Sequence, residues 1–166
     1  MLQPTVRRSW APSGQTPTHY SWDRRDRLSA ISAITVSPTR RRLGLYFDIL
    51  DHNVITDDFE QFIAHVLRRL GRPITAVMDR YQVHRSAAKR LQARFGHRVR
   101  IEWLPAYAPD LNPDEQVWNR AKYTDLVNFI PDDIHALGRA MAASFRRTRS
   151  QPSLLRSFFK HAKLLL

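Results

Sequence analysis

The strongest constraint on the fold of this chain is a short apolar run that ends at an acidic residue and is followed by a helical pattern and a second strand-like run. The first run is ITAVMD at residues 74–79, the helical pattern covers 86–95, and the second run is VRIEWLP at 99–105. A continuous apolar run is typical of a strand buried on both faces of a parallel sheet. Strand–helix–strand connections place such strands in parallel with a right-handed crossover. The pattern predicts an α/β architecture.

The segments before this unit continue the alternation. Residues 28–36 are rich in β-branched side chains and 43–50 alternate apolar with polar residues, so both read as strands joined by a turn. Residues 56–70 repeat apolar side chains at helical spacing, and Gly71 ends the pattern. Thr56, Asp57 and Asp58 offer oxygens for the helix N-cap. We expect one mixed sheet in which the strands at 74–79 and 99–103 are parallel.

The ends of the chain are of different kinds. Residues 1–27 are polar and turn-rich and have room for one hairpin at most. The last third is helical in pattern, with helices expected at roughly 114–126, 131–147 and 153–165. Residues 134–166 carry seven Lys or Arg and no acidic residue. Their Leu and Phe spacing predicts basic C-terminal helices over 127–166 and not a disordered arm. We treat 28–126 as the α/β core of a single domain.

The charge of the chain narrows the class of partner. Its 166 residues suffice for one domain with a core, and 27 basic against 15 acidic residues give a net charge of +12. Such an excess favours a polyanion, most often nucleic acid. Anionic membrane is less favoured because no apolar run approaches the roughly 18 residues of a spanning helix. The chain has no Cys, which excludes thiolate metal sites and fits a reducing, cytoplasmic setting.

Carboxylates follow two strands that we expect to be neighbours. Asp79 ends the first, and Asp110, Asp114 and Glu115 come shortly after the second. In open α/β sheets, reactive side chains gather beyond the carboxyl ends of the strands. Carboxylates there can share Mg²⁺, a hard ion with oxygen ligands. Two such ions about 4 Å apart would activate a nucleophile and stabilise the leaving oxygen at a phosphodiester.

Structural roles compete with this hypothesis. An Asp that closes a strand is often a turn former or a helix cap, so Asp79 has a structural interpretation as well as a catalytic one. Asp110 suits a turn, and Asp114 suits the first turn of a helix, where the dipole favours acids. The residues alone do not choose Glu115 over the other two.

The sequence also suggests roles for further polar and aromatic residues. His84 could orient a ligand or contact phosphate, but a His at a helix entrance is more often a surface or capping residue. Trp103 and Trp118 are expected in the core. Asp48 is expected to point outward from its strand, and Asp51 to lie in a turn.

Five basic residues are candidates for contacts with nucleic acid. Arg40, Arg41 and Arg42 form a run between two strands that could grip phosphate or simply be a solvated turn. Lys89 and Arg90 lie on the basic helix expected at 86–95.

The segment LPAYAPDLNPDEQVWNRAKY, residues 104–123, resembles the end motif of the DDE transposase core in mariner-like transposases and bacterial insertion-sequence relatives. That pattern reads approximately L-P-x-Y-S-P-D-L-N-P-I-E-x-x-W. AVMDRYQVHRS, from residue 76, is similar to the second block of this family, a strand ending in V-x-D-N and followed by a His. RRSWAPSGQTP, from residue 7, also resembles a segment of the bacterial members, so the resemblance spans nearly the whole chain.

This resemblance implies a ribonuclease H-like fold and DNA strand cleavage and transfer at transposon ends. Asp79 and Glu115 would be the second and third metal-binding carboxylates, with two Mg²⁺ or Mn²⁺ ions in a complete site. The 35 residues between them are close to the family's spacing. His84 and Asn112 would support them. Two small departures are Arg80, where the family often has Asn, and Asp114, where it has an apolar residue.

A third departure is larger. In the family, the first catalytic Asp ends the central strand, just upstream of the segment that begins here at Pro4. In this chain, the resemblance therefore implies that this Asp and its strand lie before Met1. The helix-turn-helix region that reads DNA would lie before Met1 as well. The second frame of a frameshifted element, a misplaced start and a decayed fragment all fit this pattern. The resemblance thus implies a bacterial, nucleoid-associated core that is inactive alone. Its implied partners are DNA, an upstream-frame polypeptide and a second copy of the chain.

Two rival functions stay open at this point. A non-catalytic basic DNA-binding or interaction remnant would explain the loss of the first Asp, but not the intact blocks around Asp79 and Glu115. A ribonuclease H-like nuclease of another kind would leave the segment at 104–113 unexplained.

Overall fold

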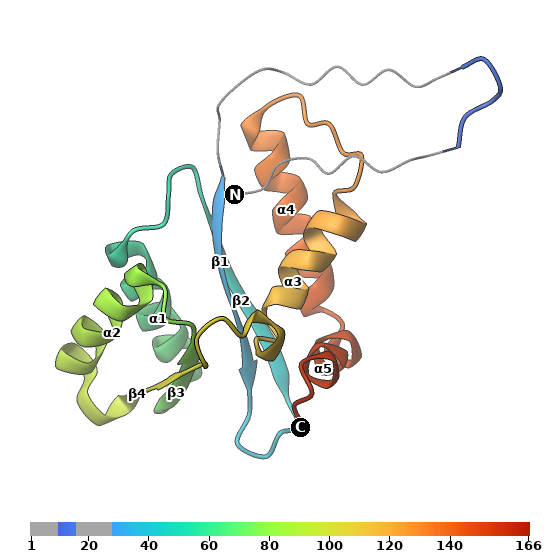
Figure 1. Cartoon of the computed structure of the whole chain (residues 1–166). Helices are drawn as coiled ribbons and strands as arrows, with labels where there is room; N and C mark the ends of the chain where they lie inside the picture. Colours follow the sequence, from blue (N-terminus) through green and yellow to red (C-terminus); the bar gives the residue numbers. More distant parts are fainter. Residues whose placement is uncertain (1–9, 16–27) are drawn as a thin grey trace.

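The computed structural model describes residues 10–15 and 28–166 (Figure 1). Its elements, in chain order, are β1 (Ser29–Val36), β2 (Leu43–Leu50), α1 (Thr56–Leu70), β3 (Ile74–Met78), α2 (Gln82–Phe95), the 3₁₀ turn η1 (Gly96–Arg98), β4 (Val99–Trp103), the 3₁₀ turn η2 (Pro109–Leu111), α3 (Glu115–Arg120), the π-helical turn η3 (Ala121–Asp125), α4 (Ile134–Arg149) and α5 (Pro152–His161). This α/β order confirms the fold class expected from the pattern. The hairpin expected within residues 1–27 lies outside the described residues, apart from a turn closed by Gln15 N–H donating to Pro12 O (3.0 Å).

The strands pair in two separate sheets and not in the single mixed sheet that we expected. β1 and β2 form an antiparallel hairpin with Ser29 opposite Leu50 and Val36 opposite Leu43. β3 and β4 are parallel, with Met78 opposite Trp103, which confirms the predicted direction. Among the described residues, no strand joins the two pairs. β1 and β3 therefore each keep one edge that pairs with no described strand.

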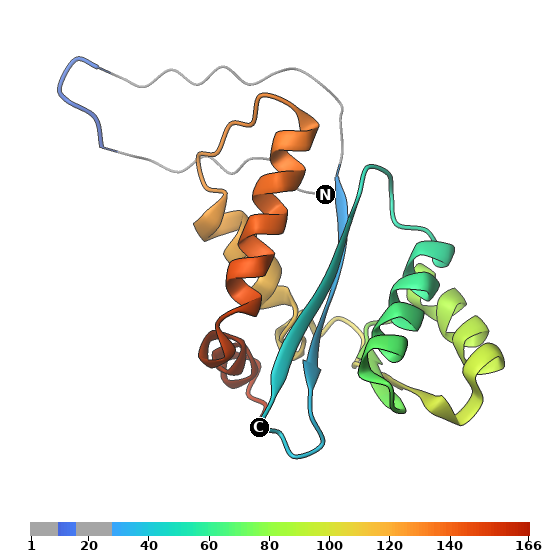
Figure 2. The same cartoon turned by 180° about the vertical axis from the view of Figure 1, so that it is seen from behind.

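Helix α1 holds the two sheets together from one side. Its buried residues Phe59, Phe62 and Ile63 share a core with Ile31 of β1 and Met78 of β3. α2 packs on α1 and β4, and Figure 2 shows α1 and α2 on one side of the molecule, away from α4 and α5. One helix thus spans the position where the ladder of hydrogen bonds is interrupted.

The opposite face of the hairpin carries a second layer of helices. Leu45 of β2 packs with Val117 of α3, Phe145 of α4 and Leu155 of α5. A smaller cluster joins Leu28, Leu126, Leu137 and Met141 at the other end of α4. The C-terminal segment is therefore helical and packed, as its apolar spacing predicts.

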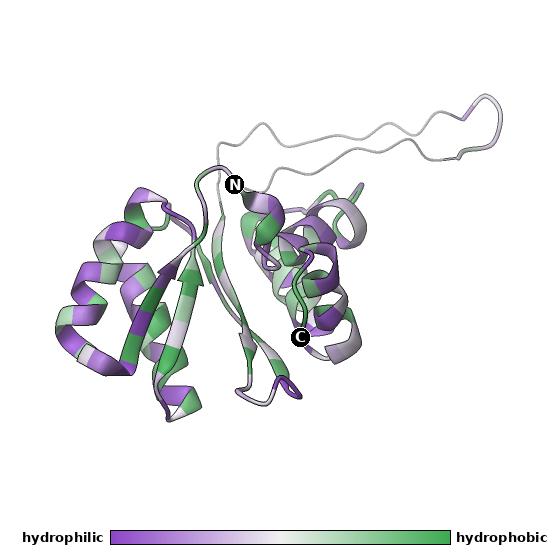
Figure 3. Ribbon diagram, turned by 60° about the horizontal axis from the view of Figure 1, so that its bottom comes forward, coloured by the Kyte–Doolittle hydropathy of each residue, from purple (hydrophilic) through white to green (hydrophobic). Residues whose placement is uncertain are grey.

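The strand at 74–78 is not buried on both faces, which corrects one prediction. Val77 is 62% exposed and Thr75 is exposed, whereas Met78 is buried. Within the described part of the chain, α1 and α2 cover one side of β3 and β4, and Figure 3 shows the strand pair uncovered on its other side. Trp103 is also 36% exposed and not in the core, because it lies at the end of the edge strand β4. Trp118 packs against the core as expected, with its ring 5.5 Å from that of Phe145.

Several helix ends differ from the sequence-based boundaries for identifiable reasons. The N-cap of α1 is Ile55, whose N–H donates to Asp58 Oδ2 (2.9 Å), so Asp58 caps the helix from inside its first turn. Gly71 ends α1 with φ = 64°, as predicted. α2 begins four residues early, at Gln82. α4 begins at Ile134, because Asp133 accepts a hydrogen bond from the N–H of Ala136. None of the described helices is long and apolar enough to cross a membrane.

Candidate active site

Asp79 and His84 form the first half of the candidate site. Asp79 directly follows β3, and its Oδ1 accepts a hydrogen bond from the N–H of Tyr81 (2.9 Å). His84 Nδ1 lies 2.6 Å from the same oxygen, close enough for a strong hydrogen bond when Nδ1 carries a proton. The His84 ring stacks at a tilt on Phe59, with centroids 4.1 Å apart. Because α2 begins at Gln82, His84 lies in the first turn and faces back to the strand end.

Glu115 forms the second half of the candidate site. It is the first residue of α3, after a loop that leaves β4 beside the end of β3, where Leu104 N–H donates to Met78 O (2.9 Å). Burial raises the pKa of Glu115, and the negative charge of Asp79 raises it further. The two carboxylates therefore lie close enough to repel each other. Because β3 and β4 are parallel, the segments that lead to Asp79 and to Glu115 leave the same end of the strand pair.

Asn112 shapes the start of α3, and its backbone oxygen accepts a hydrogen bond from the N–H of Glu115 (3.2 Å). Its Oδ1 accepts a hydrogen bond from the N–H of Asp114 (3.1 Å), just before the helix begins. Asp110 lies exposed in the 3₁₀ turn η2. These two residues take the turn and capping positions that the alternative reading assigns to such side chains.

Asp114 is the acidic residue whose environment the sequence did not foretell. Its Oδ2 accepts a hydrogen bond from the hydroxyl of Ser32 on β1 (2.6 Å), and its buried Oδ1 has no hydrogen-bond partner. Burial raises the pKa of Asp114 to about 6, although the hydrogen bond from Ser32 acts in the opposite direction. The signal available in the sequence was the departure itself, an acid where the family has an apolar side chain.

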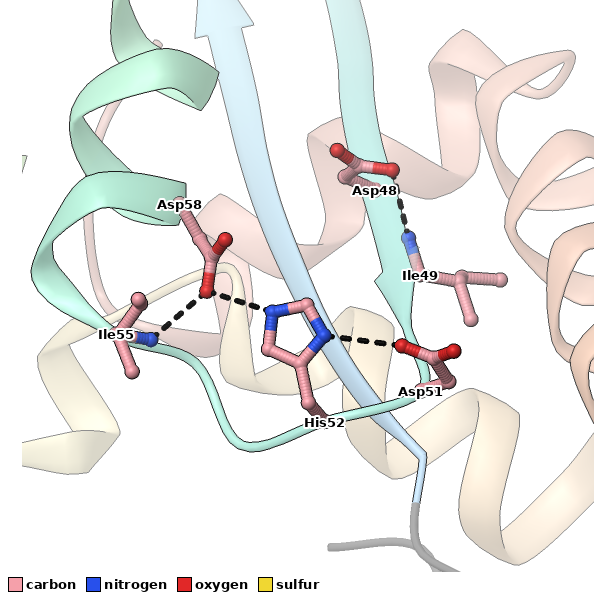
Figure 4. Close-up of polar contacts among 6 residues, drawn as sticks. All are labelled: Asp48, Ile49, Asp51, His52, Ile55 and Asp58. Carbon is pink, nitrogen blue, oxygen red and sulfur yellow. Dashed lines mark hydrogen bonds and ion pairs between the residues drawn. The ribbon is translucent and has the colours of Figure 1, made fainter.

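A separate polar cluster forms where β2 leads into α1 (Figure 4). His52 lies between Asp51 (3.0 Å from Nδ1) and Asp58 (3.1 Å from Nε2), and these hydrogen bonds raise the pKa of His52. Asp48 is exposed, as expected, and its Oδ1 accepts a hydrogen bond from the N–H of Ile49 (3.0 Å). The cluster ties the β2–α1 loop and was not predicted from the sequence.

The candidate basic residues lie on two elements. Arg40, Arg41 and Arg42 are exposed in the turn between β1 and β2, where Arg156 donates to Arg40 O (3.1 Å). On α2, Lys89 is exposed. Arg90, also on α2, forms ion pairs with Asp57 and Glu60 of α1.

Asp79 and Glu115 supply some, but not all, of the oxygen ligands that a hard divalent cation needs. Within residues 10–15 and 28–166, no three His, Asp or Glu side chains come together as a metal site. Asp79 and Glu115 supply two carboxylates, and Mg²⁺ is commonly held by one or two carboxylates together with several waters. A cavity of about 360 Å³ at the ends of β1, β2 and α4 is lined by other residues, such as Leu28, Ile49 and His135. The two carboxylates thus fit the ion, without completing a site by themselves.

Comparisons with known proteins identify the family and the fold of the chain. The family model for the DDE superfamily endonuclease matches residues 1–135. No curated protein matches the chain. A solved structure described as the "Crystal structure of the Mos1 Strand Transfer Complex" matches with a TM-score of 0.61 at 16% identity, over 98% of this chain and 48% of that chain. This chain therefore spans about half the length of that protein and shares its ribonuclease H-like fold. Because the family model covers most of the chain and the fold matches that of the solved Mos1 strand transfer complex, the chain belongs to the DDE superfamily endonucleases.

Proposed function

We propose that this chain is the catalytic core of a DDE-type transposase, in which Asp79 and Glu115 serve the cleavage and transfer of DNA strands. The observation that carries the proposal is the juxtaposition at one sheet edge. Asp79 directly follows β3 and Glu115 begins α3, and the pKa of Glu115 is raised by burial first and by the charge of Asp79 second. Two repelling carboxylates beside an exposed sheet edge are unfavourable without a cation, and a functional site is a common reason to keep them.

The residues around Asp79 hold its carboxylate in place. The Tyr81 N–H and the His84 ring both bind Oδ1, which leaves Oδ2 for another ligand. Phe59 packs on the His84 ring and limits its rotation. A divalent ion such as Mg²⁺ or Mn²⁺, when held by Asp79 and Glu115, would supply activation of a water or hydroxyl nucleophile and stabilisation of the leaving oxygen. In this proposal, His84 is a positioning residue that acts through Asp79.

DNA is the proposed substrate and partner. The net charge of +12 favours a polyanion, and exposed Arg40, Arg41, Arg42 and Lys89 offer cations for phosphate. Arg90 already neutralises Asp57, so its substitution should affect the packing of α1 on α2 as well as DNA binding.

A third carboxylate is part of the proposal. The described residues supply two acids, Asp79 and Glu115, near the carboxyl ends of β3 and β4. They also leave one edge of β1 and one edge of β3 without a strand partner. We propose that a strand ending in Asp, supplied by a preceding or separate polypeptide segment, lies between them and completes the set. The chain alone is then inactive.

A non-catalytic DNA-binding remnant is the second candidate. The count of two carboxylates among the described residues favours it. The two proposals differ in one measurable property, because only the catalytic one requires Asp79 and Glu115 to bind a divalent ion together.

Calorimetric titration of the 166-residue chain with Mn²⁺ tests this difference. The catalytic proposal expects binding that weakens at least tenfold in both Asp79→Asn and Glu115→Gln, since each removes one of two charged ligands. Asp110→Asn, which changes an exposed acid outside the pair, is the matched control and should leave binding unchanged. Equal Mn²⁺ binding in all four proteins would refute the catalytic role and leave the remnant.

DNA binding is tested by its salt dependence. Log affinity for duplex DNA should fall linearly with log salt between about 50 and 200 mM, because each neutralised phosphate releases counterions. An affinity that barely changes over this range contradicts the phosphate-contact model.

A further inference from the structure

Two tyrosines are unusually exposed near Asp79 and Glu115, at the end of the β3–β4 pair that we call the carboxylate edge. The Tyr107 side chain is fully solvent-exposed and Tyr81 is 60% exposed. Tyr107 also has φ = 57°, a left-handed backbone conformation that a bulky residue rarely adopts. Asn or Gly would occupy this conformation at lower cost. Because the Tyr107 ring is fully exposed, packing of the ring within the fold does not offset this strain.

The topology brings both tyrosines to the site. Met78 and Trp103 are paired neighbours at the ends of β3 and β4, so the loops that follow them start side by side. Tyr81 comes two residues after Asp79 and touches the His84 ring edge-on, with centroids 5.7 Å apart. Tyr107 comes three residues after Leu104, whose N–H is bonded to Met78 O. One ring therefore borders the Asp79 side of the edge, and the other lies on the loop that leads to Glu115.

We propose that Tyr107, with Tyr81, forms a stacking platform for unpaired bases of the DNA strand whose phosphodiester lies at Asp79 and Glu115. This inference rests on the proposed function and adds the form of DNA that the site takes. Aromatic side chains next to a cationic groove bind single strands by stacking, largely without regard to sequence. Arg80, exposed between Asp79 and Tyr81, is placed to pair with the phosphate that joins the stacked bases.

The surroundings favour a nucleic acid over a protein as the occupant. Arg80 and Arg85 are exposed on the same loop and first helical turns as Tyr81, so the platform is bordered by positive charge. The residues beside Tyr107 in the chain are small, Ala106 before it and Ala108 after it, and the Tyr107 side chain itself is fully exposed. A single open ring bordered by cations matches a base and its phosphate better than an apolar protein surface.

The experiment compares two DNA probes by fluorescence anisotropy with the 166-residue chain. One probe is a blunt duplex, and the other is the same duplex with a short unpaired 3′ extension. Tyr107→Asn removes the ring and suits φ = 57°, whereas Tyr107→Phe keeps the ring. Val77→Ala is the matched control, because it truncates an exposed apolar side chain on the adjacent strand that carries no ring.

We expect Tyr107→Asn to lose roughly 5- to 100-fold of affinity for the extended probe, the effect of one stacked base, and to bind the blunt duplex unchanged. Tyr107→Phe and Val77→Ala should bind both probes like the unaltered chain. The melting temperature of Tyr107→Asn should stay equal or rise, because Asn relieves backbone strain. A purely structural role for Tyr107 would instead lower it.

Either of two results with Tyr107→Asn would overturn the inference alone: an affinity for the extended probe equal to that of the unaltered chain, or equal losses on both probes. A loss in Tyr107→Phe as large as in Tyr107→Asn would also overturn it. If the unaltered chain binds neither probe, the proposed DNA function fails, and the platform fails with it. The blunt duplex thus separates failure of the inference from failure of the function.

Discussion

The two strand pairs of this molecule are built in opposite ways. The β1–β2 hairpin has helices on both faces: α1 contacts Ile31 on one side, and α3, α4 and α5 surround Leu45 on the other. The β3–β4 pair is covered by α1 and α2 on one face and leaves Val77 open on the other. The enclosed pair forms the structural centre, whereas the open pair carries Asp79 and the exposed tyrosines. Enclosure stabilises the fold, and the open pair leaves room for a partner at the carboxylate edge.

The two strand pairs also differ from a continuous sheet, because no described strand joins them by backbone hydrogen bonds. β1 and β3 are held by one α1 core but pair with no common described strand. Unpaired backbone donors and acceptors at such edges are costly when buried and invite strand addition. The four predictions below challenge this contrast, from the largest expected effect to the smallest.

Adding a strand should produce the largest change. A version of the chain extended at its N-terminus by a strand that ends in Asp should melt on the order of 10 °C higher, because several ladder bonds of about 1 kcal/mol each form at once. Mg²⁺ should stabilise this version further, since three carboxylates repel one another without it. Calorimetry of both versions measures the difference.

The control for this experiment is the same extension with Pro in the middle of the added strand, which removes a ladder donor. An unextended chain that melts as high as the extended version, and whose midpoint Mg²⁺ raises by as much, would contradict the strand proposal. The first metal ligand would then have to lie within this chain, and Asp48 would be the first residue to substitute.

Truncation in the enclosed pair should cost far more than truncation in the open pair. Leu45→Ala removes a side chain that is 1% exposed and should lower the free energy of unfolding by about 2–5 kcal/mol. Val77→Ala should lower it by less than about 1 kcal/mol, because that side chain is mostly in solvent. Denaturant titrations measure both. Similar losses would show that the open face is covered in solution.

Asp114 is expected to destabilise the protein at neutral pH. Its pKa is raised from 3.8 to about 6, so the folded state binds more protons in that window and stability falls as pH rises through it. Asp114→Asn keeps an acceptor for Ser32 and should raise the free energy of unfolding by about 3 kcal/mol above pH 6, with little effect below 3.8. Asp110→Asn, which changes an exposed acid in a turn, should leave the free energy of unfolding unchanged at both pH values. A gain that is independent of pH would refute this account.

His52 should give the smallest effect. Its pKa is raised by hydrogen bonds to Asp51 and Asp58, so its contribution is present below 6.5 and is lost as pH rises through the folded-state pKa. His52→Ala should slightly lower the melting temperature at acidic pH and leave it unchanged at alkaline pH. Melting curves at the two extremes test this. An equal loss at both would indicate a packing role.

Much of the candidate site was predictable because it depends on local pattern. Asp79 directly follows β3, and Glu115 lies on the segment that follows β4. Because the two strands are parallel, both strand ends lie at one edge of the pair. His84 was harder, because its contact with Asp79 requires α2 to begin at Gln82 and not four residues later. Trp103 was placed wrongly, since apolar character does not tell an edge strand from a central one.

The sequence by itself determined the order of strands and helices, the parallel direction of β3 and β4, and the presence of acids in the segments that follow these strands. These follow from residue periodicity and chain connectivity, which act over short distances. Only the tertiary structure decided which strand faces stay open, that Asp114 is buried against Ser32, and that β1 and β3 share a core without sharing hydrogen bonds. Those features depend on contacts between segments up to 82 residues apart, whose geometry no local pattern encodes.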